Sequence, residues 1–122
     1  MGTYEEVENR REFKREETRV PIRFEMKSSR EFGAALTRDI SEGGVRITFD
    51  GFFPLHTQLQ LAINLSDIAR TISALGVVAW SRVLPYSGRH QLGIQFLEMD
   101  EWHKKELSEY LGEKRFKAEL NL

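Results

Sequence analysis

Apolar and polar residues alternate with a period of two along most of this chain, from about Thr18 to Phe96. Successive side chains of a β-strand point to opposite faces, so this period predicts strands with one buried and one exposed face. The alternation is clearest at residues 19–25, 45–49, 59–65, 71–83 and 91–96, and a strand ending near Thr37 brings the candidates to six.

The connections between these segments are polar and rich in glycine, and residues 85–88 have the composition of a turn. No helical segment alternates with the strands, which argues against a parallel sheet. Closure is the usual way in which a small antiparallel sheet removes its exposed edges. We therefore predict a mainly β fold, a six-stranded antiparallel β-barrel that occupies residues 18–98.

Beyond Met99 the apolar residues follow a helical spacing. Asp100 is suited to cap a helix that carries Trp102, Leu107, Tyr110 and Leu111 and ends near Gly112. The pattern predicts a C-terminal helical segment over residues 99–122, with a second helical piece at 113–122. We expect this segment to plug or flank the barrel, with Trp102 near the barrel mouth.

The first 17 residues are highly charged and carry few apolar side chains. Thr3 and Glu6 have the spacing of a helix capping box, so a short helix is expected there. Such a segment has little surface with which to dock on a core. We predict a flexible N-terminal arm over residues 1–17, mobile or ordered by a ligand.

Composition narrows the classes of function. The 122 residues, 40% of them hydrophobic, suit one domain, and 18 Lys and Arg against 19 Asp and Glu argue against a general polyanion binder, so we expect no nucleic acid as partner. The absence of cysteine excludes disulfides and fits the cytoplasm, and no apolar run approaches the ~20 residues of a membrane span. The three histidines lack metal-ligand spacing and no catalytic motif is present, so we expect no metal, no cofactor and no enzymatic activity.

Two blocks of residues carry the recognisable chemistry. Arg10, Arg11 and Arg15 concentrate guanidinium groups, and by themselves they are typical of a solvated face laced with ion pairs. The run from Asp39 to Gly44 offers a carboxylate, the Ser41 hydroxyl and bare backbone, and by itself it predicts a tight hairpin. Together, the blocks could hold a ligand that carries phosphates and purine edges.

In their order along the chain, these blocks resemble the PilZ domain family. The resemblance rests on the RxxxR element, the DxSxxG element and two later strand motifs, and it covers about residues 9–111. The motifs that carry it are Arg10-Arg11-x-x-x-Arg15, Asp39-x-Ser41-x-x-Gly44, Gly76-x-Val78-x-Trp80 and Leu92-Gly93-Ile94-Gln95-Phe96. Trp80 and Phe96 themselves are expected in the core.

The resemblance implies a six-stranded barrel that binds the bacterial second messenger cyclic di-GMP. By the family pattern, Arg11 and Arg15 grip phosphate and guanine, with Arg10 adding charge and stacking. An alternative register, in which Arg15 and Arg19 form the RxxxR pair, stays open; otherwise Arg19 is a peripheral contact.

In the second block, the same pattern has Asp39 and Ser41 meet the edge of a guanine. Gly44 would keep that surface open. Gly43 occupies a variable position of the motif and is a possible further contact.

The expected mechanism is an order change in which the arm closes over the bound nucleotide and relays the signal to an unidentified protein partner. Motility and biofilm formation are processes that this family commonly regulates. Two alternatives remain: a nucleotide-independent adaptor for protein partners, for example in pilus or motility regulation, and a small single-stranded nucleic-acid-binding barrel.

Overall fold

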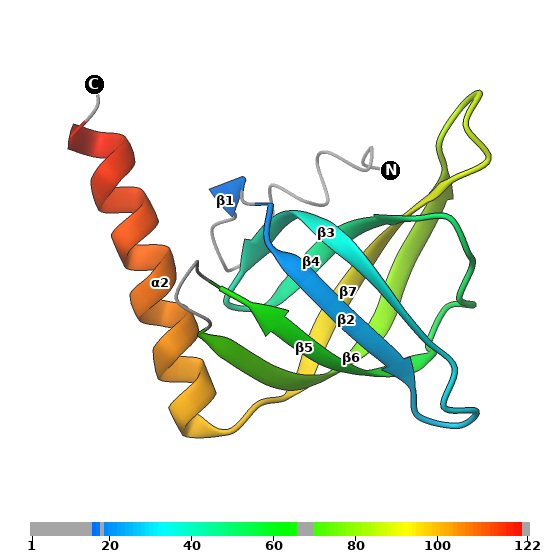
Figure 1. Cartoon of the computed structure of the whole chain (residues 1–122), viewed down its shortest axis with the longest axis horizontal. Coiled ribbons are helices and arrows are strands. Elements are labelled where there is room, and N and C mark those ends of the chain that lie inside the picture. The colour runs from blue at the N-terminus through cyan, green and yellow to red at the C-terminus, as the bar shows by residue number, and fades with distance from the viewer. Residues whose placement is uncertain (1–15, 18, 66–69, 121–122) are drawn as a thin grey trace, which may run out of the picture.

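In the computed structural model, the chain forms one barrel with a C-terminal helix (Figure 1). The structure describes residues 16–17, 19–65 and 70–120, except for the side chains of 16–17 and 117–120. The helix is α2 (Glu101–Leu120). The strands are β1 (Glu16–Glu17), β2 (Pro21–Met26), β3 (Phe32–Ser41), β4 (Gly44–Phe49), β5 (Gln58–Asn64), β6 (Thr71–Val83) and β7 (His90–Glu98).

The strands β2 to β7 form the closed six-stranded antiparallel barrel that the alternation predicts. Their order in the sheet is β3-β2-β5-β6-β7-β4, and pairing between β3 and β4 closes the circle. Strand β1 is an additional short strand that pairs with β3, with Glu16 opposite Ile40 and Glu17 opposite Asp39. The capping-box helix expected near the N-terminus lies outside the described residues, but Glu16 and Glu17 are extended.

The barrel core contains the apolar phase of most of the predicted strands. Ile22 and Phe24 of β2 are buried, whereas Pro21 and Arg23 between and beside them are exposed. The other fully buried apolar side chains of the strands follow the same period and are Ile40, Val45, Ile47, Leu59, Leu61, Ile63, Ile72, Val78, Leu92 and Ile94. Burial of this apolar surface is the main stabilising contribution to such a fold.

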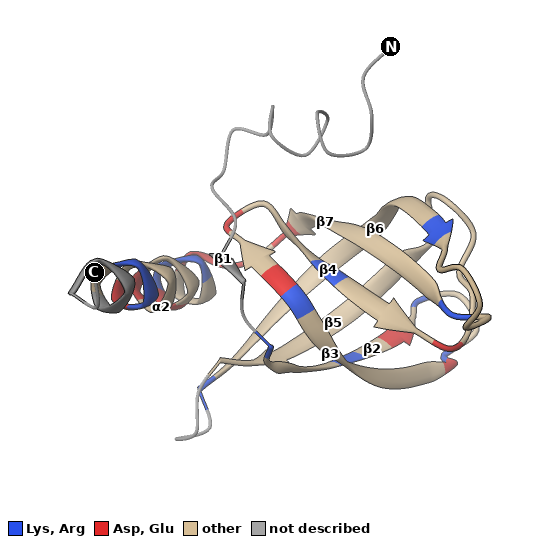
Figure 2. Cartoon of the chain, turned by 90° about the horizontal axis from the view of Figure 1, so that it is seen from above, with Lys and Arg blue, Asp and Glu red and all other residues tan. Residues whose placement is uncertain are grey.

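The helix α2 flanks one end of the barrel and does not enter it (Figures 1 and 2). Leu107, Tyr110 and Leu111 are its buried residues, as predicted. Asp100 caps it, because its Oδ1 accepts a hydrogen bond from the His103 N–H at 2.8 Å. Within the described residues, no helix combines the length and the apolar character that a membrane span requires.

Two predictions about this helix are wrong. Trp102 does not pack on the barrel mouth; its side chain is 67% exposed. The helix also does not end near Gly112 but runs without a break to Leu120. A single glycine costs a helix only about 1 kcal/mol, and the residues that follow Gly112 are mostly good helix formers.

The helix also makes polar contacts with β6 and with the residue before it. The Ser73 N–H of β6 donates a hydrogen bond to His103 Nδ1 at 3.2 Å. Arg70 lies 3.6 Å from Glu106 and 3.3 Å from Glu113 of α2. These contacts join α2 to the start of β6, and the helix also lies close to β1.

Candidate ligand-binding site

The run from Asp39 to Gly44 forms the tip of the β3–β4 hairpin. Ser41 pairs with Gly44, so the turn itself consists of Glu42 and Gly43 alone. The hydroxyl of Ser41 accepts a hydrogen bond from the Gly43 N–H at 3.2 Å and donates one to the Gly44 carbonyl at 3.4 Å. The predicted hairpin is present, but β3 continues beyond Thr37 to Ser41, so Asp39 and Ser41 lie in the strand and not in the turn.

Asp39 lies opposite Arg46 of β4, and the two side chains form an ion pair. Its neighbour Ile40 is in the core, so Asp39 faces the outside of the barrel. Even so, only 2% of Asp39 is exposed, and Ser41 is 1% exposed. Both polar residues of the motif are thus satisfied by groups of the protein in this state.

The strand registers place a row of four residues across the outside of the barrel. Asp39 is opposite Arg46, Arg46 is opposite Gly93 of β7, and Gly93 is opposite Trp80 of β6. We call Asp39, Arg46, Gly93 and Trp80 the outer row. It combines a carboxylate, a guanidinium group and an aromatic ring on neighbouring strands, which suits recognition of a planar polar ligand.

Trp80 lies on this outer surface, so the prediction that it belongs to the core is wrong. A Cβ atom added at Gly93 would lie 2.0 Å from the Cε2 and Nε1 atoms of the Trp80 ring, so the indole covers the glycine backbone. Any other residue at position 93 would displace the ring. Phe96, in contrast, packs against the core as expected.

Arg46 and Trp80 lie in the outer row, although neither was predicted as a site residue: Arg46 lies outside the motifs, and Trp80, which ends one of them, was expected in the core. Arg46 lies two positions after the DxSxxG motif, in the outward phase of its strand. This position was the signal by which the sequence could have indicated Arg46. The position of Trp80 beside Arg46 depends on the pairing of β4, β7 and β6, which the sequence pattern does not specify.

Gly44 is required by packing. A Cβ atom at this position would lie 2.2 Å from the carbonyl oxygen of Ile94 on β7. Neither Gly43 nor Gly44 has positive φ; among the described glycines only Gly88 does. The absence of a side chain at Gly44 therefore serves the close approach of two strands.

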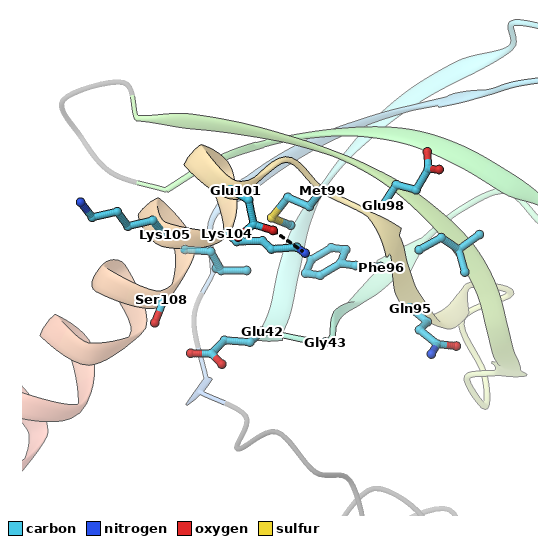
Figure 3. Close-up of a pocket in the computed structure, with 12 residues that line it drawn as sticks. Glu42, Gly43, Gln95, Phe96, Glu98, Met99, Glu101, Lys104, Lys105 and Ser108 are labelled. Atoms are coloured by element: carbon cyan, nitrogen blue, oxygen red, sulfur yellow. Dashed lines mark hydrogen bonds and ion pairs between the residues drawn. The ribbon is translucent and has the colours of Figure 1, made fainter.

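A groove with a volume of about 590 Å³ lies between the hairpin tip, the end of β7 and the helix α2. Figure 3 shows Glu42 and Gly43 of the hairpin on one side and Lys104, Lys105 and Ser108 of α2 on the other. Its lining is largely apolar, with Phe96 and Met99 between the two sides. The outward residue Gln95 joins this groove to the outer surface of β7.

The arginine block lies mostly outside the described residues, which include neither Arg10, Arg11 nor Arg15. The structure does place the residue that follows Arg15, because Glu16 pairs with Ile40 of β3. Arg19 is exposed and lines a second groove, together with Leu36 and Arg38 of β3.

The three histidines have separate surroundings. His56 is exposed in a loop, the His90 ring packs 5.2 Å from the ring of Phe52, and His103 joins α2 to β6. Among the described residues, no cluster of three or more His, Asp or Glu side chains could hold a metal ion.

Comparison with protein families matches residues 9–113 to the PilZ domain. Among solved structures, the chain superposes with a TM-score of 0.76 on the Bacillus subtilis inhibitor of motility MotI/DgrA, at 22% identity over 88% of this chain and 52% of that one. It superposes with a TM-score of 0.78 on K. pneumonia MrkH in a complex with c-di-GMP, at 16% identity over 93% of this chain and 56% of that one.

A third superposition, on Escherichia coli YcgR in complex with c-di-GMP, has a TM-score of 0.76 at 12% identity and covers 92% of this chain and 49% of that one. The chain thus spans about half the length of these three proteins. A search of curated proteins found no match.

Proposed function

Because the chain belongs to the PilZ domain family, we propose that it is a receptor for cyclic di-GMP. The RxxxR and DxSxxG elements would bind the nucleotide, and the arm formed by residues 1–17 would relay the signal to a downstream protein in the cytoplasm. Two superposed proteins, MrkH and YcgR, were solved in complex with c-di-GMP, which supports this choice of ligand.

The pairing of β1 with β3 is the observation that carries the proposal. Arg15 precedes Glu16, and consecutive Cα atoms are about 3.8 Å apart. Since Glu16 is opposite Ile40, the arginine block is attached beside the DxSxxG strand. This attachment supports the proposal that both blocks contact one ligand.

The chemistry of each block fits a part of this ligand. The Watson–Crick edge of guanine offers N–H donors, for which the Asp39 carboxylate and the Ser41 hydroxyl are acceptors. Guanidinium groups can pair bidentately with phosphate oxygens or with guanine O6 and N7. We infer that the guanine edge competes with Arg46 for Asp39, and that Arg46 then turns toward the ligand.

Calorimetric titration with cyclic di-GMP tests the proposal. Loss of one charge-assisted clamp contact costs about 1.5–3 kcal/mol, so Arg11→Ala and Arg15→Ala should each weaken binding by roughly tenfold or more. Lys14→Ala removes a cation between them and serves as the matched control, with near wild-type affinity. If Arg19→Ala has the large effect and Arg11→Ala does not, the working pair is Arg15 and Arg19.

Tryptophan fluorescence locates the ligand independently. The chain contains two tryptophans, so Trp102→Phe leaves Trp80 as the emitting residue. Cyclic di-GMP on the outer row should change the emission of Trp102→Phe and leave that of Trp80→Phe unchanged. A change of emission in Trp80→Phe, with none in Trp102→Phe, would place the nucleotide away from the outer row.

The alternative is an adaptor that binds protein partners without nucleotide. The internal pairing of Asp39 with Arg46 is consistent with it, because both motif side chains already have partners. If millimolar cyclic di-GMP produced no heat of binding and no change in tryptophan fluorescence, this alternative would be selected.

A further inference from the structure

The strand β3 has an open edge. Its residues Phe32–Leu36 pair with β2 on one side, whereas β4 pairs with β3 only from Thr37 onward. In Figure 1, β3 and β4 diverge from this point toward the right of the picture. No strand among the described residues lies against the free side of Phe32–Leu36.

The backbone groups of this edge point outward in alternation. The Thr37 N–H donates to the Val20 carbonyl at 2.9 Å and so points toward β2. In an antiparallel pair, alternate residues direct their N–H and C=O groups to the same neighbour. Ala34 and Leu36 therefore direct theirs to the open side, where an extended peptide could pair with them.

The side chains and the surface beside the edge suit such a peptide. Phe32 is 81% exposed and Leu36 is 53% exposed, on the same face of β3. A groove of about 430 Å³ follows the edge, between Ala34–Arg38 and the residues Thr48–Asp50 at the end of β4. Backbone pairing supplies affinity in this kind of recognition, and pockets for alternate side chains supply specificity.

The positive charge of the groove favours an acidic partner. Its lining includes Arg19, Arg38 and Arg89, with Asp50 as the one acidic side chain. Arg89 is neutralised by Asp50 at 2.8 Å, whereas Arg19 and Arg38 are exposed and make no ion pair with a described residue. The groove is therefore cationic, and carboxylates on the incoming strand would complement it.

A second copy of the same chain is a poorer occupant. Antiparallel pairing of two β3 edges about Ala34 would place Arg38 of one copy opposite Arg30 of the other. Parallel pairing would place like residues, including both Arg38 side chains, next to each other. Like charges opposite one another destabilise a strand pair.

We propose that the open edge of β3 docks an extended segment of a partner protein in which acidic and apolar residues alternate, by addition of a strand to the barrel. This surface does not depend on nucleotide binding. Since the same strand carries Asp39 and Ser41, it also provides a short route from the nucleotide site to a partner.

The probe is a synthetic fluorescent peptide of alternating Glu and Val, with a Lys and Val peptide of equal length as control. We expect the acidic peptide to bind in anisotropy titrations and to shift the amide resonances of Ala34 and Leu36. Ala34→Pro removes an outward N–H, and Arg38→Glu reverses a charge; each should weaken binding at least about tenfold. Lys114→Glu, a reversal on the exposed side of the distant helix α2 and outside both grooves, should bind like the wild type.

Several results would overturn the proposal. These are no binding of the acidic peptide at millimolar concentration, equal binding of the basic peptide, or full affinity in both folded edge variants. A concentration-dependent dimer that Ala34→Pro abolishes would show that a second copy occupies the edge. The affinity of Ala34→Pro for cyclic di-GMP, measured in parallel, should be unchanged. Nucleotide titration and peptide titration therefore test the proposed function and the proposed docking surface separately.

Discussion

Gly44 provides a test that separates a structural role from a ligand-binding role. In the substitution Gly44→Ala, the new Cβ atom would lie 2.2 Å from the Ile94 carbonyl oxygen, and such contacts are not found below 3.0 Å. Strands β4 and β7 would have to separate by about 0.8 Å, the difference between these distances. The contacted atom belongs to the backbone, so it cannot rotate away as a side chain would.

Overpacking of this kind costs about 1–3 kcal/mol, and a backbone clash belongs at the upper end of the range. For a chain of this length, a loss of about 3 kcal/mol corresponds to a fall of about 12 °C in the melting temperature. Since stabilities of small domains are about 5–15 kcal/mol, the variant should still fold at room temperature. Its nucleotide affinity can therefore be measured in the folded state.

The assay is thermal and urea unfolding followed by circular dichroism, with Gly112→Ala as the matched control. A Cβ atom at Gly112 meets nothing within 4 Å, and the residue lies in the interior of α2. Replacing it by alanine should stabilise the protein by about 0.5–1 kcal/mol. The same chemical change should thus have opposite signs at the two positions.

The reasoning is refuted if Gly44→Ala unfolds at the wild-type temperature. If this stable variant also lost cyclic di-GMP binding, Gly44 would act through the ligand surface alone. Equal destabilisation by Gly112→Ala would likewise contradict the argument, because it would show that loss of glycine, and not the clash, is the cause.

Three further substitutions test the contacts around the site and the helix, each by urea unfolding. Arg46→Met should destabilise the protein by about 2–3 kcal/mol, because it leaves the buried Asp39 carboxylate without its ion pair. Adding Asp39→Asn should recover part of this loss. An unchanged free energy of unfolding in Arg46→Met would contradict the prediction. Asp100→Ala should cost about 1 kcal/mol by removing the helix cap, whereas Asp100→Asn should cost less. Arg70→Gln should cost under about 1 kcal/mol despite two ion pairs, and a larger loss would mean that these partly exposed pairs fix the helix.

The fold was largely predictable because its signals are local. Alternation over residues 71–83 has the same bounds as β6, and Asp100 caps the helix as expected. A period of two requires only neighbouring residues to be compared, and so does a capping residue before a helical spacing. The break expected at Gly112 failed because a local propensity of about 1 kcal/mol did not outweigh the surrounding helix formers.

The candidate site was predictable in part. The hairpin from Asp39 to Gly44 is present, and its residues are adjacent in sequence. The sequence did not indicate that Asp39 is buried against Arg46, because an acceptor in a motif does not reveal whether a ligand or the protein supplies its donor. The same limit explains why Trp80 was expected in the core: its strand was correctly predicted, but its face was not.

The sequence by itself determined where the six barrel strands lie, which phase of most strands is apolar and which segments carry arginine or acidic motifs. The tertiary structure alone decided which strands are neighbours. The outer row exists because β4, β7 and β6 pair in one register, and the open edge exists because β3 is longer than its pairing with β4. Strand pairing joins residues distant in the chain, and alternation specifies the face of a residue without specifying the strand beside it.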